Sequence, residues 1–193
     1  MPDGTLPRDR TPKTLPTAQA HLFGLLVFVA GVVSMATTAA AADGAPSAFQ
    51  GVWRHSPGAQ EEQLRVQAIE TATKDLGLLV RDRARQRLNE RTTPASELKL
   101  LLEGDRLEIS RQGNSLVLRL GAEPILVQRD GDEGRLSARV DGQTIVVTSQ
   151  DEQGSRVTTY ALSPDGKQLT LSVRLTGSRL SSPLIYRSTY VRK

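Results

Sequence analysis

Apolar and polar residues alternate in short runs through the second half of the chain, from Glu97 to Arg192. The clearest run is Leu169-Thr170-Leu171-Ser172-Val173-Arg174-Leu175. Successive side chains of a strand point to opposite faces of a sheet, so each run predicts a strand with one buried face. These strands are predicted at residues 98–103, 106–111, 115–120, 124–129, 135–141, 143–150, 155–163, 168–176 and 184–192.

The joints between these runs are short and contain Gly, Asp or Asn, as in Gly104-Asp105 and Asp141-Gly142. Joints of this length suit antiparallel hairpins, because a parallel crossover needs a dozen or more residues. We therefore predict a mainly β fold with an N-terminal helical insert, in which an antiparallel up-and-down barrel has about eight or nine strands. Closure would remove the exposed sheet edges. An open or half-closed sheet is the alternative.

The alternation also predicts which side chains face the interior. The apolar residues at inward positions are Leu100, Leu107, Ile109, Val117, Ile125, Val127, Leu136, Val140, Ile145, Val147, Leu169, Leu171, Val173 and Leu175. A barrel of about eight strands is filled by its own side chains or holds one small ligand. We interpret Tyr160, Tyr186 and Tyr190 as cross-strand neighbours. Alternatively, their hydroxyls give an apolar pocket a polar tip.

A helix is predicted over residues 60–91, because apolar residues recur there at intervals of three and four, from Leu64 to Leu88. Gly77 weakens the middle of this helix by about 1 kcal/mol relative to Ala, so two helices with a break near Gly77 are the alternative. Pro94 ends the helical segment, since the residue before a proline is pushed out of the helical region.

Arginine is concentrated in the last part of this segment, at Arg81, Arg83, Arg85, Arg87 and Arg91, whereas Glu61 and Glu62 stand at its start. Acid at the start and base at the end complement the helix dipole, and a solvated arginine face needs no further explanation. The alternative is a cationic surface for anionic lipid headgroups or another envelope polyanion.

The N-terminus has the pattern of a secretory signal peptide. Basic residues up to Lys13 precede an uncharged apolar run from Leu22 to Ala36, and small residues follow as far as Ala42. We predict that residues 1–42 are a signal peptide and that residues 43–193 form one domain in the periplasm or outside the cell. The alternative is an inner-membrane anchor, because residues 22–42 are long enough to cross a bilayer at about 20 residues.

Composition and motifs argue against several classes of function. The chain of 193 residues has no cysteine, which excludes a disulfide framework, a thiolate nucleophile and a cysteine zinc site. A net charge of +4 is too weak to indicate a nucleic-acid partner. His55 is the single histidine after residue 42, no Gly-x-Ser-x-Gly elbow occurs, and the acidic loop of Asp130, Asp132 and Glu133 lacks the rest of a calcium-loop pattern. We predict no enzyme activity, no metal and no cofactor.

Three stretches of the chain together resemble a known family. They are Phe49-x-Gly51-x-Trp53, Tyr160-x-Leu162-Ser163-Pro164-Asp165-Gly166-Lys167 and Tyr186-Arg187-x-x-Tyr190-Val191-Arg192. This combination resembles uncharacterised exported bacterial proteins with a lipocalin-like domain. The resemblance implies that Trp53 closes one end of the barrel, beneath an arginine of the last strand. Arg187 is the first choice for that arginine and Arg192 is the second.

The resemblance and the signal peptide lead to two hypotheses on function. The first is an exported, non-enzymatic lipocalin-like protein that binds an apolar small molecule or a lipid. The second is an envelope interaction module that contacts anionic surfaces through the arginine-rich helix. The chain departs from lipocalins in the long helical segment between Trp53 and the first predicted strand, and in its lack of cysteine.

Overall fold

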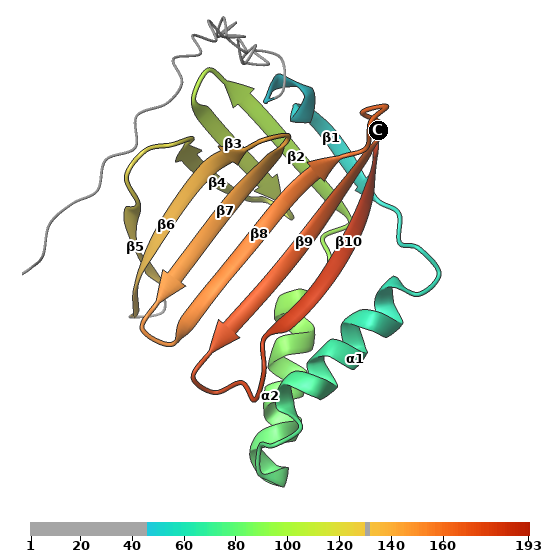
Figure 1. The fold of residues 1–193 in the computed structure, drawn as a ribbon, viewed down its shortest axis with the longest axis vertical. Coiled ribbons are helices and arrows are strands. Elements are labelled where there is room, and N and C mark those ends of the chain that lie inside the picture. The colour runs from blue at the N-terminus through green and yellow to red at the C-terminus, as the bar shows by residue number, and fades with distance from the viewer. Residues whose placement is uncertain (1–45, 130–131) are drawn as a thin grey trace, which may run out of the picture. The chain divides into compact units, whose positions relative to one another are not determined.

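The computed structural model describes residues 46–129 and 132–193 (Figure 1). Its strands form one antiparallel sheet of ten strands, in the order β4-β3-β2-β1-β10-β9-β8-β7-β6-β5. The predicted signal segment, residues 1–42, and Asp130 of the acidic loop lie outside the described residues. The signal peptide and the membrane anchor therefore stay predictions.

Two meanders account for most of this order, because consecutive strands pair from β2 to β4 and from β5 to β10, whereas β4 and β5 lie at the two ends of the order. The elements are β1 (Gly51–His55), α1 (Glu61–Thr73), α2 (Leu78–Thr92), β2 (Glu97–Glu103), β3 (Arg106–Arg111), β4 (Asn114–Arg119), β5 (Ile125–Arg129), β6 (Asp132–Asp141), β7 (Thr144–Asp151), β8 (Gly154–Leu162), β9 (Gln168–Gly177) and β10 (Leu184–Arg192), after a short 3-10 turn at Ser47–Phe49.

The predicted strand count is wrong by one strand, β1. It pairs with both β2 and β10, with Trp53 opposite Leu98 on one side and Arg192 on the other. The nine other strands match the nine predicted runs to within a few residues. The strand β1 has five residues, and its inward positions hold Gly51, Trp53 and His55, so it carries no aliphatic alternation.

The sheet curls round on itself without closing into a full barrel. Among the described residues, β4 and β5 share no ladder. Only a parallel bridge between Leu120 and Ala138 spans the seam, where the Gly121 N–H donates to the Ala138 carbonyl at 2.8 Å. Gly121 has a left-handed φ of 73°, and Pro124 has no N–H to donate, so the strand β4 cannot continue its pairing there. The predicted mainly β, antiparallel fold with a helical insert is confirmed, but the sheet has the half-closed form and is not a closed barrel.

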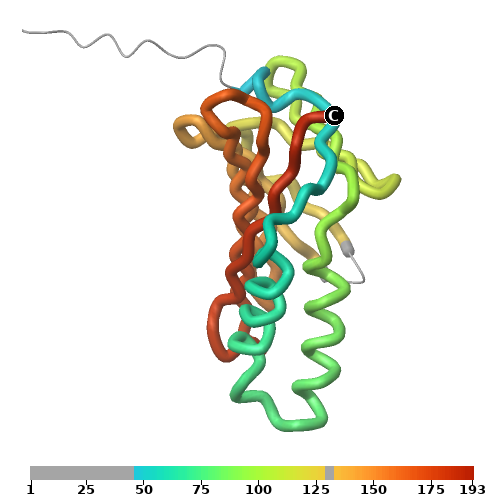
Figure 2. The backbone as a smooth tube through the Cα atoms, turned by 90° about the vertical axis from the view of Figure 1, so that its right-hand side faces the viewer, coloured from blue at the N-terminus to red at the C-terminus, as the bar shows by residue number. Residues whose placement is uncertain are grey.

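The helical segment is a hairpin of two helices, so the single helix over 60–91 is corrected to the two-helix alternative. Gly77 leaves the helical conformation with ψ of 146°, and its carbonyl accepts the N–H groups of Val80 and Arg81 at the start of α2. The helix α1 packs through Ile69 and Ala72 on residues of β9 and β10. Figure 2 shows the turn of the hairpin projecting beyond the end of the strands.

The interior is an apolar core along the concave face of the sheet. Its buried members are Phe49, Trp53, Leu98, Leu100, Leu107, Ile109, Leu118, Ala138, Ile145, Val147, Tyr160, Leu169 and Tyr190. Three residues that were predicted to face inward are exposed, with exposed fractions of 42% for Val117, 43% for Ile125 and 40% for Val140. The register explains the exposure of Val117, because Leu107 pairs with Leu118 and Ile109 pairs with Leu116, which leaves Val117 on the outer face.

Candidate functional site

One end of the concave face is closed around Trp53. This side chain is 0% exposed, and its indole N–H donates to the Phe49 carbonyl at 3.0 Å. The guanidinium of Arg192 lies 4.3 Å from the centre of the indole ring and donates to the carbonyls of Gln50 and Ala48 at 2.7 Å each. Such a cation–π contact contributes about 0.5–2 kcal/mol.

The arginine over Trp53 is Arg192, so the first choice of Arg187 is corrected. Inward positions of β10 are the even-numbered ones, since Leu184, Tyr186 and Tyr190 are buried. Arg187 therefore lies on the outer face, where it is exposed. Gly51 makes room for the arginine that is present: its φ is +149°, and a Cβ there would lie 2.7 Å from Arg192 Nη1.

Away from Trp53 the same face becomes polar. Arg156 and Thr158 occupy inward positions of β8. Thr158 pairs with Val173 of β9, which pairs with Tyr186 of β10, so Tyr186 lies in the same row as Thr158. Arg156 Nη2 donates to Tyr186 Oη at 3.4 Å, and Arg156 Nε donates to Thr158 Oγ1 at 3.4 Å. Both hydrogen bonds are long, so they leave the guanidinium able to bind another acceptor.

The three tyrosines, Tyr160, Tyr186 and Tyr190, are all buried on this face. Burial raises the pKa of each hydroxyl, and it raises the pKa of Tyr190 to about 12. The positive charges of Arg156 and Arg111 act in the opposite direction on the pKa of Tyr160 and Tyr186. Burial prevails, so the hydroxyls are neutral near pH 7 and remain hydrogen-bond donors.

Arg111 lies on the same concave face, on a different part of the curled sheet from this cluster. It ends β3 at an inward position, opposite Leu98, and its charge acts on all three tyrosines. Within residues 46–129 and 132–193, no carboxylate forms an ion pair with Arg111 or Arg156. The concave face therefore carries two positive charges beside three hydroxyl groups.

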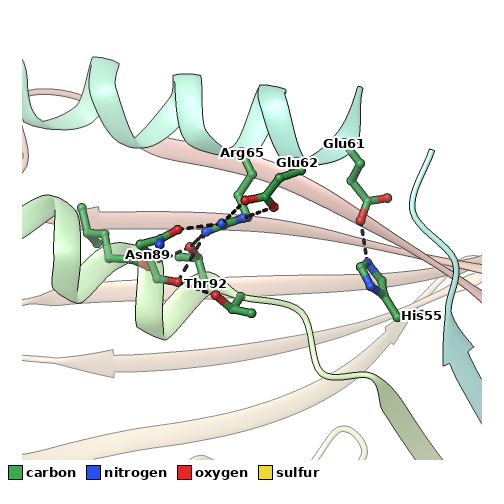
Figure 3. Close-up of polar contacts among 8 residues, drawn as sticks. His55, Glu61, Glu62, Arg65, Asn89 and Thr92 are labelled. Carbon is green, nitrogen blue, oxygen red and sulfur yellow. Dashed lines mark hydrogen bonds and ion pairs between the residues drawn. The ribbon is translucent and has the colours of Figure 1, made fainter. Parts of the chain in front are cut away.

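The carboxylate of Glu61, near Tyr190, is already engaged. Its Oε1 lies 2.8 Å from His55 Nε2, and its Oε2 accepts the Thr189 N–H at 2.9 Å (Figure 3). The His55 ring in turn lies 5.2 Å from the ring of Tyr190. These contacts fix the start of α1 against β1 and β10, and they give the single histidine of the described residues a structural position.

Arg65 holds the two helices together. It reaches from α1 to α2, where it donates to Thr92 Oγ1 and to Asn89 Oδ1 at 2.7 Å each (Figure 3). On its own helix it contacts both carboxylate oxygens of Glu62, at 2.9 and 2.6 Å. The hydrogen bond from Arg65 lowers the pKa of Glu62. This contact network fixes α2 against α1, and α1 packs on β9 and β10.

The structure has a cleft of about 240 Å³ at the seam of the sheet. It is lined by Val117, Leu118, Arg119, Ala122, Glu123, Ile125, Leu136 and Ser137. A second, shallower groove of about 270 Å³ lies on the outside, between α1 and Pro183 and Ile185. Both are slightly smaller than the about 300 Å³ at which small-molecule pockets begin. The cleft alone is therefore too small for a typical small-molecule ligand.

The five arginines proposed as an anionic-surface site differ in their contacts. Arg81 donates to the Leu76 carbonyl at 2.9 Å, and Arg85 pairs with Glu70. Arg83, Arg87 and Arg91 are exposed, and the part of the chain that the structure describes offers them no ion pair.

The described part of the chain contains no cluster of residues fit to hold a metal ion. None of its helices is long and apolar enough to span a membrane.

Comparison with known proteins finds similarity only among solved structures. No family model matches the chain, and no curated protein matches it. Lipid binding protein 8 of Caenorhabditis elegans is 18% identical, with a TM-score of 0.48 over 77% of this chain and 97% of that one. Fatty-acid-binding protein 1 of Echinococcus granulosus is 12% identical, with a TM-score of 0.45 over 76% and 98%. Human cRBP IV is also 12% identical, with a TM-score of 0.45 over 75% and 97%.

The arginines of the concave face were missed by the sequence analysis, although the alternation marks them. Arg156 stands two residues before Thr158 and four before Tyr160, in the same inward series. Arg111 follows Leu107 and Ile109 in the same way. A charged residue at an inward position of a strand was the signal, and only apolar residues were considered there.

Proposed function

We propose that the protein binds an amphipathic small molecule that carries an anionic group. The observation that supports this proposal is the pair of arginines on the concave face, Arg156 and Arg111, neither of which has an acidic partner among the described residues. A carboxylate placed between them would accept hydrogen bonds from both guanidiniums and from the neutral hydroxyl of Tyr186.

The apolar part of the ligand has a path that starts at Arg156. Strand pairing aligns Arg156 with Ser149, Ser149 with Leu136, and Leu136 with Ile125, across β8, β7, β6 and β5. With about 4.8 Å between strands, this row runs about 14 Å from Arg156 to Ile125. Leu136 and Ile125 line the cleft at the seam. A ligand with its head group at Arg156 would lay a medium-length alkyl chain along the row, into the cleft.

The arrangement favours moderate affinity. Each charge-assisted hydrogen bond contributes about 1.5–3 kcal/mol where it is shielded from water. Arg156 is partly buried and Arg111 is exposed, so solvent reduces the contribution of each. Loss of the Arg156 contact alone is expected to weaken binding about tenfold, which corresponds to about 1.4 kcal/mol.

Calorimetric titration with decanoate and decanol tests the proposal. Decanol has the same alkyl chain without the charge. Arg156→Gln and Arg111→Gln should each weaken decanoate binding about tenfold and leave decanol binding within about twofold. Arg174→Gln is the matched control, because Arg174 lies on the outer face of β9. Equal affinity of the unaltered protein for both ligands, or an equal effect of Arg174→Gln, would refute the role of the two arginines.

We also propose that binding takes place after export, in the periplasm or outside the cell. The support is the basic lead, the apolar run from Leu22 to Ala36 and the small residues before Asp43. Amino-terminal sequencing of the protein from fractionated cells tests this. A mature protein that begins near Asp43 is expected, whereas an intact N-terminus in the membrane fraction would favour the anchor formed by residues 22–42.

A further inference from the structure

The turn of the helical hairpin exposes three consecutive large apolar side chains. Leu78, Leu79 and Val80 are 76%, 93% and 60% exposed. They form the first turn of α2, and the hairpin places them at its projecting end (Figure 2). A folded protein rarely exposes adjacent large apolar residues to water without a binding role.

Leu79 and Val80 belong to the apolar series from which one continuous helix was predicted, and the break at Gly77 explains why they are exposed. The side of α2 that faces away from solvent is another stripe, in which Thr92 is buried and Arg81, Ala84 and Leu88 are partly buried. Leu79 lies about 180° from the centre of that stripe, at 100° per residue. The packing of the hairpin therefore leaves the apolar turn without a partner in residues 46–129 and 132–193.

Positive charge adjoins the apolar turn on the same side of the helix. Leu79, Arg83, Arg87 and Arg91 follow one another at intervals of four residues, which places them in one row. The helix α2 has five arginines against Asp82 and Glu90, a net charge of 5 − 2 = +3. At the turn itself, Asp75 and Asp82 stand against Lys74, Arg81 and Arg83.

We infer that the hairpin turn docks on an anionic lipid surface. With a rise of 1.5 Å per residue, Arg83 lies about 6 Å and Arg87 about 12 Å from Leu79 along the helix. Insertion of the apolar turn by about 5–10 Å therefore brings both guanidiniums to the level of the lipid headgroups. The apolar triplet supplies burial, and the arginine row supplies the preference for anionic lipid. This surface is separate from the proposed ligand site, so either can fail alone.

A single-thiol label tests the inference on the whole chain. Because the protein has no cysteine, Leu79→Cys provides one attachment point for an environment-sensitive dye. Gln143→Cys, in the turn between β6 and β7 at the other end of the sheet, is the control (Figure 1). With vesicles of phosphatidylcholine and phosphatidylglycerol, the emission at position 79 should shift to the blue, and the emission at position 143 should not. Pure phosphatidylcholine should give little shift.

Charge and apolar variants of the unlabelled protein, measured by co-sedimentation with the same vesicles, complete the test. Each arginine near an anionic surface strengthens binding about fivefold, so Arg83→Gln with Arg87→Gln should weaken it about 25-fold. Arg174→Gln with Arg187→Gln, on the outer face of the sheet, removes the same charge and should have little effect. Leu78, Leu79 and Val80 changed together to Ser should weaken vesicle binding at least tenfold with an unchanged melting temperature.

Three outcomes would overturn the inference. One is sedimentation with anionic vesicles while the dye at position 79 stays in water, since another part of the chain would then make the contact. The second is an equal blue shift with neutral lipid. The third is a dye already shielded at position 79 before vesicles are added, because a second copy or another segment would then cover the turn.

Discussion

The contacts of Arg65 allow a sharp prediction about what holds the helical hairpin together. Thr92 is buried, and its hydroxyl accepts from Arg65 and donates to the Leu88 carbonyl, at 2.7 Å each. Thr92→Val keeps the shape and removes the acceptor of a charged donor, which costs about 1.5–3 kcal/mol. Glu62, another partner of Arg65 besides Asn89, has a side chain that is 66% exposed, so Glu62→Gln should cost about 0.5 kcal/mol or less.

Urea unfolding followed by the fluorescence of Trp53, the single tryptophan, measures both changes. With a slope of about 2 kcal/mol per molar urea, Thr92→Val should lower the midpoint by about 1 M. Thr71→Val is the control, because the Thr71 hydroxyl makes an exposed hydrogen bond to the Gln67 carbonyl. It should change the free energy of unfolding by less than about 0.5 kcal/mol. A larger loss in Glu62→Gln than in Thr92→Val would refute the reasoning that burial determines the strength of this contact network.

Three further predictions concern the core and its closed end. Arg192→Met should lower the free energy of unfolding by about 2–3 kcal/mol, through the lost stacking and carbonyl contacts, whereas Arg187→Met should stay within about 0.5 kcal/mol in the same urea assay. Gly51→Ala should destabilise by about 2 kcal/mol, since it combines a positive φ with a close approach of Arg192; a melting temperature equal to the unaltered protein's would contradict the geometry. The pKa of Tyr190 is raised to about 12, so its contribution to stability is present below pH 10, the ordinary pKa, and is lost as pH rises from 10 to about 12. Alkaline unfolding should therefore show a weaker pH dependence in Tyr190→Phe, as measured by circular dichroism across this range.

Much of the fold follows from local patterns that can be read directly from the sequence. Period-two alternation and short glycine turns are properties of neighbouring residues, so nine strands could be placed from them. The strand β1 was not predicted, because its formation depends on pairing with β2 and β10, which lie far along the chain. The degree to which the sheet closes could not be predicted for the same reason, since it depends on how β4 meets β5 and β6 and not on any one strand.

Part of the candidate site was predictable, because even- and odd-numbered residues of a strand lie on opposite faces of the sheet. Tyr186, Tyr190 and Arg192 share one parity, which Arg187 does not, so the alternation already favoured Arg192 as the partner of Trp53. That Arg111 and Arg156 both lie near Tyr160 and Tyr186 could not be predicted, because it depends on the curl of the whole sheet. The exposed turn at Leu79 depends on how the hairpin packs, which helical periodicity leaves open.

The pairing of β1 with β10 also orders events during synthesis. Trp53 is opposite Arg192, and the Lys193 N–H donates to the Val52 carbonyl at 2.9 Å, so the middle of the sheet is joined by residues from the two ends of the domain. Contacts so distant in sequence form slowly, and these cannot form at all before β10 has left the ribosome. The sheet of a nascent chain therefore stays incomplete until β10 has been synthesised, and removal of β10 alone would leave β1 paired with β2 only.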